Sequence, residues 1–129
     1  MKGDISPRLS AGSLLFTGYD DNSLQVNQHR YASGITIHQG AVSEHWAPAT
    51  LREIRIEHLA PLIDPAPEVI ILGTGRLTAF PAADILDYMA EHHIGLECMD
   101  SRSAARTYNI LVGEGRTVSA AFLLPGARK

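Results

Sequence analysis

The chain has 129 residues, of which 45% are hydrophobic and 19% are charged, as in an ordinary globular domain. A formal net charge of -3 provides no positive field for nucleic acid or an anionic membrane surface. One cysteine excludes an internal disulfide framework and suits a reducing compartment. The first residues lead into no long apolar run, and no later stretch is long enough to cross a bilayer. We therefore expect one domain over residues 1–129, located in the cytoplasm, with no nucleic-acid partner and no membrane insertion.

The N-terminal part of the chain, about residues 12–56, has the pattern of β structure. An apolar run begins at Leu14 and ends at Gly18, before a turn-rich stretch. Leu24 and Val26 then alternate with polar residues at the period of a strand. We therefore expect β-strands on both sides of the turn-rich stretch.

A β-hairpin is predicted over residues 34–46, with Gln39 and Gly40 as its two-residue loop. In this register Ile37 faces Val42, and the apolar side chains share one face of both strands, apart from Glu44. The opposite face is polar and carries Thr36, His38, Ser43 and His45. The pattern favours an antiparallel sheet with one wetter side.

Residues 57–67 form a boundary, because three prolines within seven positions each remove a backbone donor. We interpret this stretch as a connector to a C-terminal α/β half over residues 68–125. The hydrophobic pattern of that half predicts strands at 69–72, 96–99 and 118–123 and helices near 82–93 and 101–112. The order strand, helix, strand, helix, strand favours one sheet with right-handed crossovers.

Capping residues mark the ends of the two predicted helices. Gly95 fits the exit of the first helix, and Asp100 can cap the start of the second. We expect one face of the first helix to be buried, and we expect His93 to pack on that face. Its apolar residues are Ala82, Ile85, Leu86 and Met89.

A series of short motifs runs in order through the C-terminal half. It comprises Ile70-Ile71-Leu72-Gly73-Thr74-Gly75, Gly95-Leu96-Glu97-Cys98-Met99-Asp100, Ala105-Arg106-Thr107-Tyr108-Asn109-Ile110-Leu111, Glu114-Gly115-Arg116 and Ala120-Ala121. This ordered combination resembles the family of the mitochondrial complex I (NADH:ubiquinone oxidoreductase) assembly factor 3. That family also contains many bacterial and archaeal proteins classed as a domain of unknown function. The resemblance covers most of the chain and is strongest over residues 68–125.

The resemblance implies a three-layer α/β fold, with a central mixed β-sheet, helices on one side and additional N-terminal β structure on the other. The family carries no established catalytic residues, so the resemblance implies neither a catalytic site nor a cofactor. Its eukaryotic member acts as a protein partner during assembly, which implies a non-enzymatic interaction or assembly factor. This chain shows no Arg-rich, acid-poor mitochondrial leader, so we expect a bacterial, cytoplasmic member.

The alternative function is a binding domain or an enzyme that takes a small anion or other small molecule at the ends of two predicted strands. The residues concerned are Gly73, Thr74, Gly75 and Arg76 after the first strand, and Ser101, Arg102 and Arg106 at the start of the second helix. If the strands are parallel neighbours, these segments share one edge of the sheet, where amides and guanidiniums favour an anion. Asn109 lies on the same flank of the helix as the arginines. In the competing interpretation the glycines form a sharp turn and the arginines pair with Asp84 or Asp100.

Cysteine and histidine side chains can act as nucleophiles or as metal ligands, but no pattern in this sequence supports either role. Cys98 lies on a short strand without a histidine signature, so we expect an inert core thiol. His38 and His45 lie about 13 Å apart in the predicted hairpin, which is too far for one zinc ion. His92 and His93 are adjacent and point in different directions on a helix. We therefore predict no metal site and no cofactor.

Trp46 stands at the end of the predicted hairpin. A large aromatic side chain beside a polar face suits a surface that binds a protein partner. We therefore predict that Trp46 belongs to a partner-binding surface, with a core position as the alternative.

Overall fold

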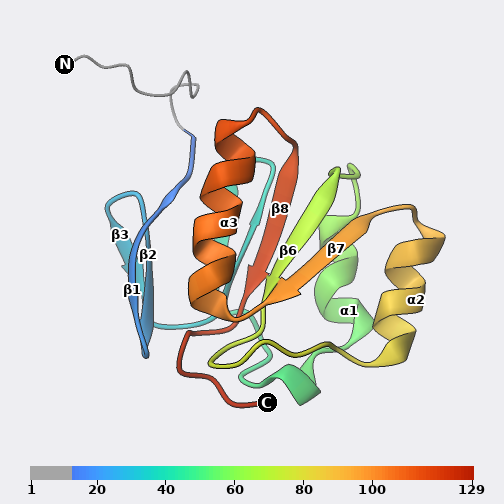
Figure 1. Cartoon of the computed structure of the whole chain (residues 1–129), viewed down its shortest axis with the longest axis horizontal. Coiled ribbons are helices and arrows are strands. Elements are labelled where there is room, and N and C mark those ends of the chain that lie inside the picture. The colour runs from blue at the N-terminus through green and yellow to red at the C-terminus, as the bar shows by residue number, and fades with distance from the viewer. Residues whose placement is uncertain (1–12) are drawn as a thin grey trace.

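The computed structural model describes residues 13–129, which form two β-sheets and three α-helices (Figure 1). The expectations about a leader and about the start of the β half at residue 12 concern residues outside this described part. A three-stranded antiparallel sheet contains β1 (Phe16–Asp20), β2 (Ser23–Val26) and β3 (His29–Tyr31). A five-stranded sheet of order β5-β4-β8-β6-β7 contains β4 (Ile35–His38), β5 (Ala41–Glu44), β6 (Val69–Gly73), β7 (Gly95–Met99) and β8 (Val118–Phe122). The helices are α1 (Ile56–Leu59), α2 (Ala83–Glu91) and α3 (Ser101–Gly113), with 3-10 helices at Leu51–Glu53 and Ala60–Leu62.

The five-stranded sheet contains strands from both predicted halves of the chain. β6 pairs in parallel with β7 and β8, whereas β4 pairs antiparallel with β8. The predicted N-terminal hairpin therefore supplies two strands of the central sheet and makes that sheet mixed. The separate β1-β2-β3 sheet is the additional N-terminal β structure. The α/β class with a central mixed sheet is confirmed.

The hairpin register predicted from the alternation of side chains is confirmed. Ile37 pairs with Val42, and Gln39 and Gly40 form the two-residue loop. Both loop residues have positive φ, at 51° and 75°, as a type I′ turn requires. The turn therefore matches the twist of the two strands that it joins.

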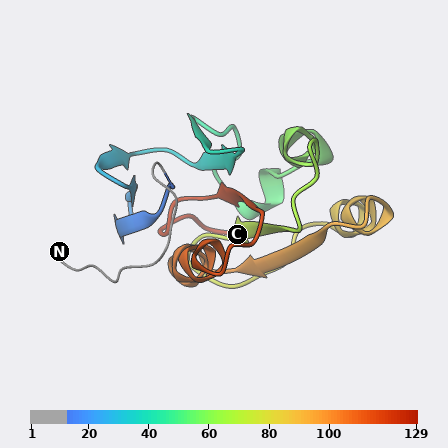
Figure 2. The same cartoon turned by 90° about the horizontal axis from the view of Figure 1, so that it is seen from above.

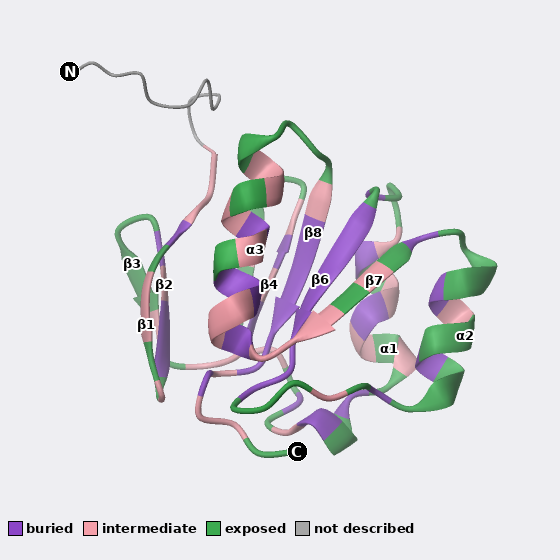
Figure 3. Ribbon diagram, in the orientation of Figure 1, coloured by how far each residue is buried: buried purple, intermediate pink, exposed green. Residues whose placement is uncertain are grey.

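The two faces of the central sheet support two separate hydrophobic clusters, and β6 is buried on both faces (Figure 3). On one face, α3 and the three-stranded sheet pack through Phe16, Leu24, Val26, Ile35, Ile37, Val69, Ile71, Ala104, Ala105, Tyr108, Ala120 and Phe122. On the other, α1, α2 and the 3-10 helices pack through Leu51, Ile54, Leu59, Leu62, Ile70, Leu72, Ile85, Met89, Ile94, Ala121 and Leu123. The layers therefore differ from the expected arrangement in one respect: α3 shares its face with the additional strands, whereas α1 and α2 cover the opposite face (Figures 1 and 2).

Helix α2 is shorter and less buried than its sequence pattern predicts. Ile85 and Met89 are buried, but Leu86 is exposed. His93 is also exposed, so the expectation that it packs on the apolar face is wrong. His93 has a φ of 58° and makes the left-handed turn after the helix that we expected of Gly95. Gly95 instead begins β7, one of the two edge strands of the central sheet.

Helix α3 begins and ends close to its predicted limits. The side chain of Asp100 accepts a hydrogen bond from the Ser103 amide at 3.1 Å, so this residue is the predicted N-cap. Ala104, Ala105 and Tyr108 are buried against the central sheet. The cap and the buried stripe together fix which flank of α3 faces the three-stranded sheet.

Candidate functional site

Strands β6 and β7 end at the same edge of the central sheet, as expected of parallel neighbours. Gly73, the last residue of β6, pairs with Met99, the last residue of β7. The Ser101 amide donates to the Gly75 carbonyl at 2.9 Å, and the Gly75 amide donates to Ser101 Oγ at 2.9 Å. Ser101 Oγ donates in turn to the Leu123 carbonyl at 2.7 Å. The structure therefore brings the glycine loop and the N-terminus of α3 together.

The backbone amides of this loop donate within the protein. The Thr74 amide donates to the Met99 carbonyl at 2.8 Å, and the Arg76 amide donates to the Ala127 carbonyl at 2.9 Å. With the Gly75 amide bonded to a serine hydroxyl, three consecutive amides have internal acceptors. Thr74 and Gly75 are buried, whereas Arg76 is exposed. The loop amides therefore hold the strand ends in place.

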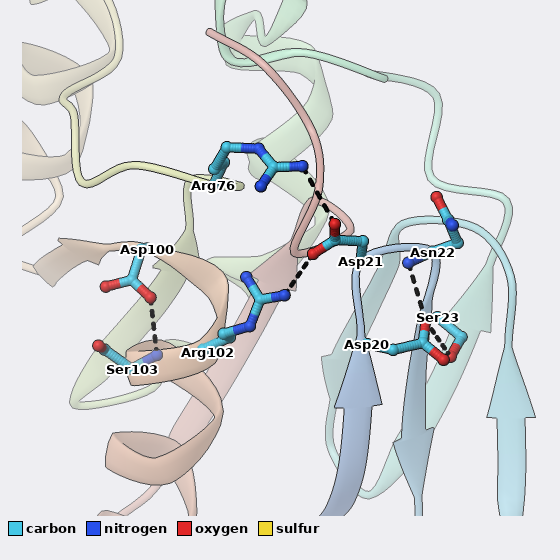
Figure 4. Close-up of polar contacts among 8 residues, drawn as sticks. All are labelled: Asp20, Asp21, Asn22, Ser23, Arg76, Asp100, Arg102 and Ser103. Atoms are coloured by element: carbon cyan, nitrogen blue, oxygen red, sulfur yellow. Dashed lines mark hydrogen bonds and ion pairs between the residues drawn. The ribbon is translucent and has the colours of Figure 1, made fainter.

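A carboxylate from the three-stranded sheet lies between the two arginines of this edge (Figure 4). Asp21, in the turn between β1 and β2, accepts from Arg102 on Oδ1 and from Arg76 on Oδ2, the latter at 3.2 Å. Hydrogen bonds from these guanidiniums, that of Arg102 first, hold the pKa of Asp21 below its ordinary value. The acid that pairs with the arginines is therefore Asp21 rather than Asp84 or Asp100. No local pattern marks it, because it lies 55 and 81 residues away from its partners.

The rest of this flank of α3 also contacts the three-stranded sheet. Arg106 donates to the Tyr19 hydroxyl at 2.6 Å, and the Arg102 guanidinium lies 5.9 Å from the centre of the Tyr19 ring. Asn109 accepts from the Phe16 amide at 2.8 Å and donates to the Phe16 carbonyl at 2.7 Å. The polar flank seen in the sequence therefore positions one sheet against a helix, a role that sequence reasoning missed.

The Asp21→Asn variant is expected to lose stability at neutral pH and to match the wild type in acid. Because the arginines depress the folded-state pKa of Asp21, its contribution is complete above the ordinary value of 3.8. The contribution disappears as the pH falls through the lower folded-state value. Urea unfolding at about pH 7 and about pH 2 measures this difference. We expect a modest effect, because solvent screens an exposed ion pair.

The Asp87→Asn variant is the control for loss of one negative charge. Asp87 is exposed in the middle of α2, and no hydrogen bond or ion pair within residues 13–129 engages its side chain. We expect this variant to unfold like the wild type at both pH values. A loss of stability in Asp21→Asn that stayed constant into acid would contradict the ionic role of Asp21.

Trp46 lies at the boundary between core and surface. Its Nε1 donates to the His58 carbonyl at 3.2 Å, and the two rings meet edge-on with centroids 6.3 Å apart. Its ring packs partly against the hydrophobic cluster of α1 and α2. Trp46 also lines a cavity of about 360 Å³, together with Pro48 and Leu124. The half-buried ring can therefore support the fold and contribute to a surface.

Cys98 is expected to react slowly in the folded protein. Burial, and secondly the carboxylate of Glu97, raise the pKa of Cys98 to about 11. Relative to an ordinary thiol at 9.0, this gives about a hundredfold less thiolate at neutral pH. Iodoacetamide should accordingly modify the folded chain about a hundredfold more slowly than the urea-unfolded chain. Equal rates would show that the thiol is accessible and that folding does not suppress its reactivity.

The histidines of the predicted hairpin have separate surroundings. His38 Nδ1 lies 2.7 Å from Ser119 Oγ, and its Nε2 lies 3.1 Å from the Asp64 carbonyl oxygen. His45 is exposed beyond β5. Within residues 13–129, no three His, Cys, Asp or Glu side chains gather as a metal ion would require. Across the same described part of the chain, every helix is too short or too polar to span a membrane.

Curated relatives carry assembly-factor and membrane-protein names. The chain is 28% identical over 120 residues to NADH dehydrogenase (ubiquinone) 1 alpha subcomplex assembly factor 3 of Danio rerio, covering 92% of this chain and 68% of that protein. The Homo sapiens protein of the same name is 25% identical over 120 residues, with 92% and 65% covered. A "13 kDa major membrane protein" of Francisella tularensis is 35% identical over 69 residues, with 54% and 56% covered. The chain thus spans about two thirds of the length of the first two relatives.

Solved structures share both the fold and part of the sequence. A crystal structure of a Bordetella parapertussis protein has 34% identity and a TM-score of 0.80, covering 87% of this chain and 96% of that one. A solution structure of a Mth938-like domain from Bordetella pertussis has 28% identity and a TM-score of 0.81, covering 98% and 94%. The family described as "Protein of unknown function (DUF498/DUF598)" matches residues 16–123. The resemblance carried by the C-terminal motifs is confirmed, and the chain belongs to the DUF498/DUF598 family.

Proposed function

We propose that this protein is a non-enzymatic interaction factor that helps to assemble a larger protein complex. Similarity over 92% of the chain to relatives named as assembly factors supports this proposal. The structural observation that carries this proposal is that polar groups at the ends of β6 and β7 bond to other groups of the protein. Asp21 engages both Arg76 and Arg102, and Ser101 engages Gly75. Groups that a binding or catalytic site would offer to a ligand are bonded to the protein itself.

We infer that Trp46 and its cavity of about 360 Å³ belong to the surface that meets the partner. An indole that is half-buried has a fixed orientation and retains apolar area for a contact. Such aromatic anchors beside concave surfaces contribute much of the binding energy in protein interfaces.

Affinity purification under gentle conditions, followed by mass spectrometry, tests the interaction function. We expect one protein to co-purify in stoichiometric amount, to be lost from Trp46→Ala and to be retained by Trp46→Phe. Circular dichroism must show that Trp46→Ala still folds, because the substitution removes the hydrogen bond to His58. Retention by a folded Trp46→Ala variant would reject Trp46 as the contact. Recovery of a small molecule in place of a protein would reject the interaction function.

We further propose that residues 1–129 act as one domain in the bacterial cytoplasm and bind no nucleic acid. The central sheet supports the single domain, because it takes strands from both halves of the sequence. The single cysteine supports a reducing compartment, and the net charge of -3 opposes nucleic-acid binding. Fractionation of the native host, with nuclease treatment as a control, would test these assignments.

The alternative candidate is a small-anion site at Arg76 and Arg102. The observation in its favour is that both guanidiniums converge on one carboxylate, as they would on a carboxylate or phosphate ligand. An external anion would have to replace Asp21, so we expect weak binding to the wild-type protein. Inorganic phosphate should raise the unfolding temperature of Asp21→Asn, and a second substitution, Arg102→Ala, should abolish this rise. Equal responses of the wild type and both variants would end this alternative.

A further inference from the structure

We propose that the loop between β6 and α2 is a docking site for an acidic, apolar segment of a protein partner. This inference rests on the proposed interaction function and names a site for it. The loop carries Leu77, which is 57% exposed, and Phe80, which is 68% exposed. Within residues 13–129 only two other large apolar side chains are exposed, Leu86 on α2 and Ile110 on α3. Two such side chains on one short loop form an apolar feature that a partner would cover.

Hydrogen bonds hold this loop in a defined shape. The buried Thr74 hydroxyl donates to the Leu77 carbonyl at 2.7 Å. The Asp100 amide donates to the Thr78 hydroxyl at 2.9 Å and so ties the loop to the start of α3. A loop that is already fixed loses little conformational entropy when a partner binds. Leu77 and Phe80 are therefore presented to solvent by a rigid support.

A cavity of about 330 Å³ lies beside Phe80. Leu51, Ile54 and Pro81 line it and are buried, so part of its wall is apolar. An apolar side chain of a partner can enter this cavity while Phe80 packs against the partner's surface. Interlocking of this kind is typical of the contacts that dominate protein interfaces. A lipid surface would contact the protruding side chains but would insert no shaped group into the cavity, so the geometry favours a protein.

The charged side chains that line this cavity are positive, although the whole chain has a net charge of -3. Arg52 and Lys129 line the cavity, and they lie in the segments 51–55 and 128–129. Arg55 and Arg128 belong to the same two segments. None of these four cations forms an ion pair within the described residues. The one acid in these segments, Glu53, accepts a backbone hydrogen bond at 2.8 Å. Charge complementarity therefore points to carboxylates beside the partner's apolar anchor.

A random peptide library displayed on phage tests the proposal, with selection on the wild-type protein. We expect enriched peptides to combine an aromatic or aliphatic residue with flanking Asp or Glu. A synthetic peptide of the enriched sequence should bind Phe80→Ala at least about tenfold more weakly. It should also bind Arg52→Glu more weakly, with a larger loss at low ionic strength. Ile110→Ala is the matched control, because this exposed side chain lies in the last turns of α3, and it should bind as the wild type does.

Absence of enrichment overturns the proposal, as do peptides that lack acidic residues or bind Phe80→Ala as tightly as the wild type. Sedimentation with phosphatidylglycerol vesicles that requires Leu77 and Phe80, without peptide binding, also overturns it and assigns the loop to a membrane surface. All three substituted side chains, Arg52, Phe80 and Ile110, are exposed, and thermal unfolding verifies that the variants fold. A protein that co-purifies equally with the wild type and Phe80→Ala would reject this site and leave the interaction function standing. The two failures are therefore distinguishable.

Discussion

The Gly75→Ala substitution is expected to lower the free energy of unfolding by about 4 kcal/mol. Gly75 has a φ of 96°, a conformation that strains any residue with a side chain. A Cβ at this position would also lie 2.5 Å from the Ala127 carbonyl oxygen. That oxygen accepts the Arg76 amide, so it cannot move without loss of a hydrogen bond. Urea unfolding monitored by circular dichroism measures the change.

Two other glycines separate the causes of this loss. Gly115 has a φ of 80°, but a Cβ there would meet no atom within 4 Å, so Gly115→Ala should cost only about 1 kcal/mol of backbone strain. Gly113 has neither a positive φ nor a close neighbour, and Gly113→Ala should not destabilise the protein. If Gly75→Ala proved as stable as Gly115→Ala, the segment around Ala127 would have to move away from the new Cβ without lowering the free energy of unfolding.

The Ser101→Ala substitution is expected to cost about 3 kcal/mol, although it removes a single oxygen atom. The buried hydroxyl accepts from the Gly75 amide at 2.9 Å and donates to the Leu123 carbonyl at 2.7 Å. Alanine would leave both backbone groups without a partner in a buried position, and each such group costs about 1–3 kcal/mol. The stability of the variant in urea gives the cost directly.

Ser103→Ala is the control in the same helix. The Ser103 hydroxyl is partly exposed, accepts from the Arg106 guanidinium at 3.3 Å and lies beside the Asp100 carboxylate. We expect its removal to change the free energy of unfolding by less than about 0.5 kcal/mol. Equal effects of the two substitutions would contradict the role of Ser101 as a bridge between the loop and β8.

The features that could be predicted from the sequence depend on neighbouring residues. Gln39-Gly40 allows two positive φ values in succession, and the side-chain alternation around it sets the hairpin register. Asp100 caps α3 because its side chain reaches an amide three residues ahead. The run from Val69 to Leu72 is apolar at every position, and it forms a strand that is covered on both faces.

The features that escaped prediction depend on residues that meet only after folding. Asp21 lies in an ordinary turn, and its role follows from the position of the three-stranded sheet beside α3. Asn109 bonds the backbone of Phe16, which any residue there would offer, so the sequence carries no mark of the pairing. Phe80 is exposed because its loop is held by Thr74 and Thr78, whose spacing alone did not indicate such bonds. Local patterns therefore placed the loop and the helix of the candidate site but not the acid between them.

Strand β8 lies between β4 and β6, although it follows every other strand in the chain. During synthesis the hairpin of β4 and β5 and the unit of β6, α2 and β7 leave the ribosome first. Only β8 pairs with both of them, so each keeps an unpaired edge until residues 118–122 emerge. Open strand edges invite pairing with other chains, and such distant contacts form slowly. The two parts of the central sheet therefore stay unjoined until the last strand is made, and until then chaperones or the pace of the ribosome must keep their open edges from other chains.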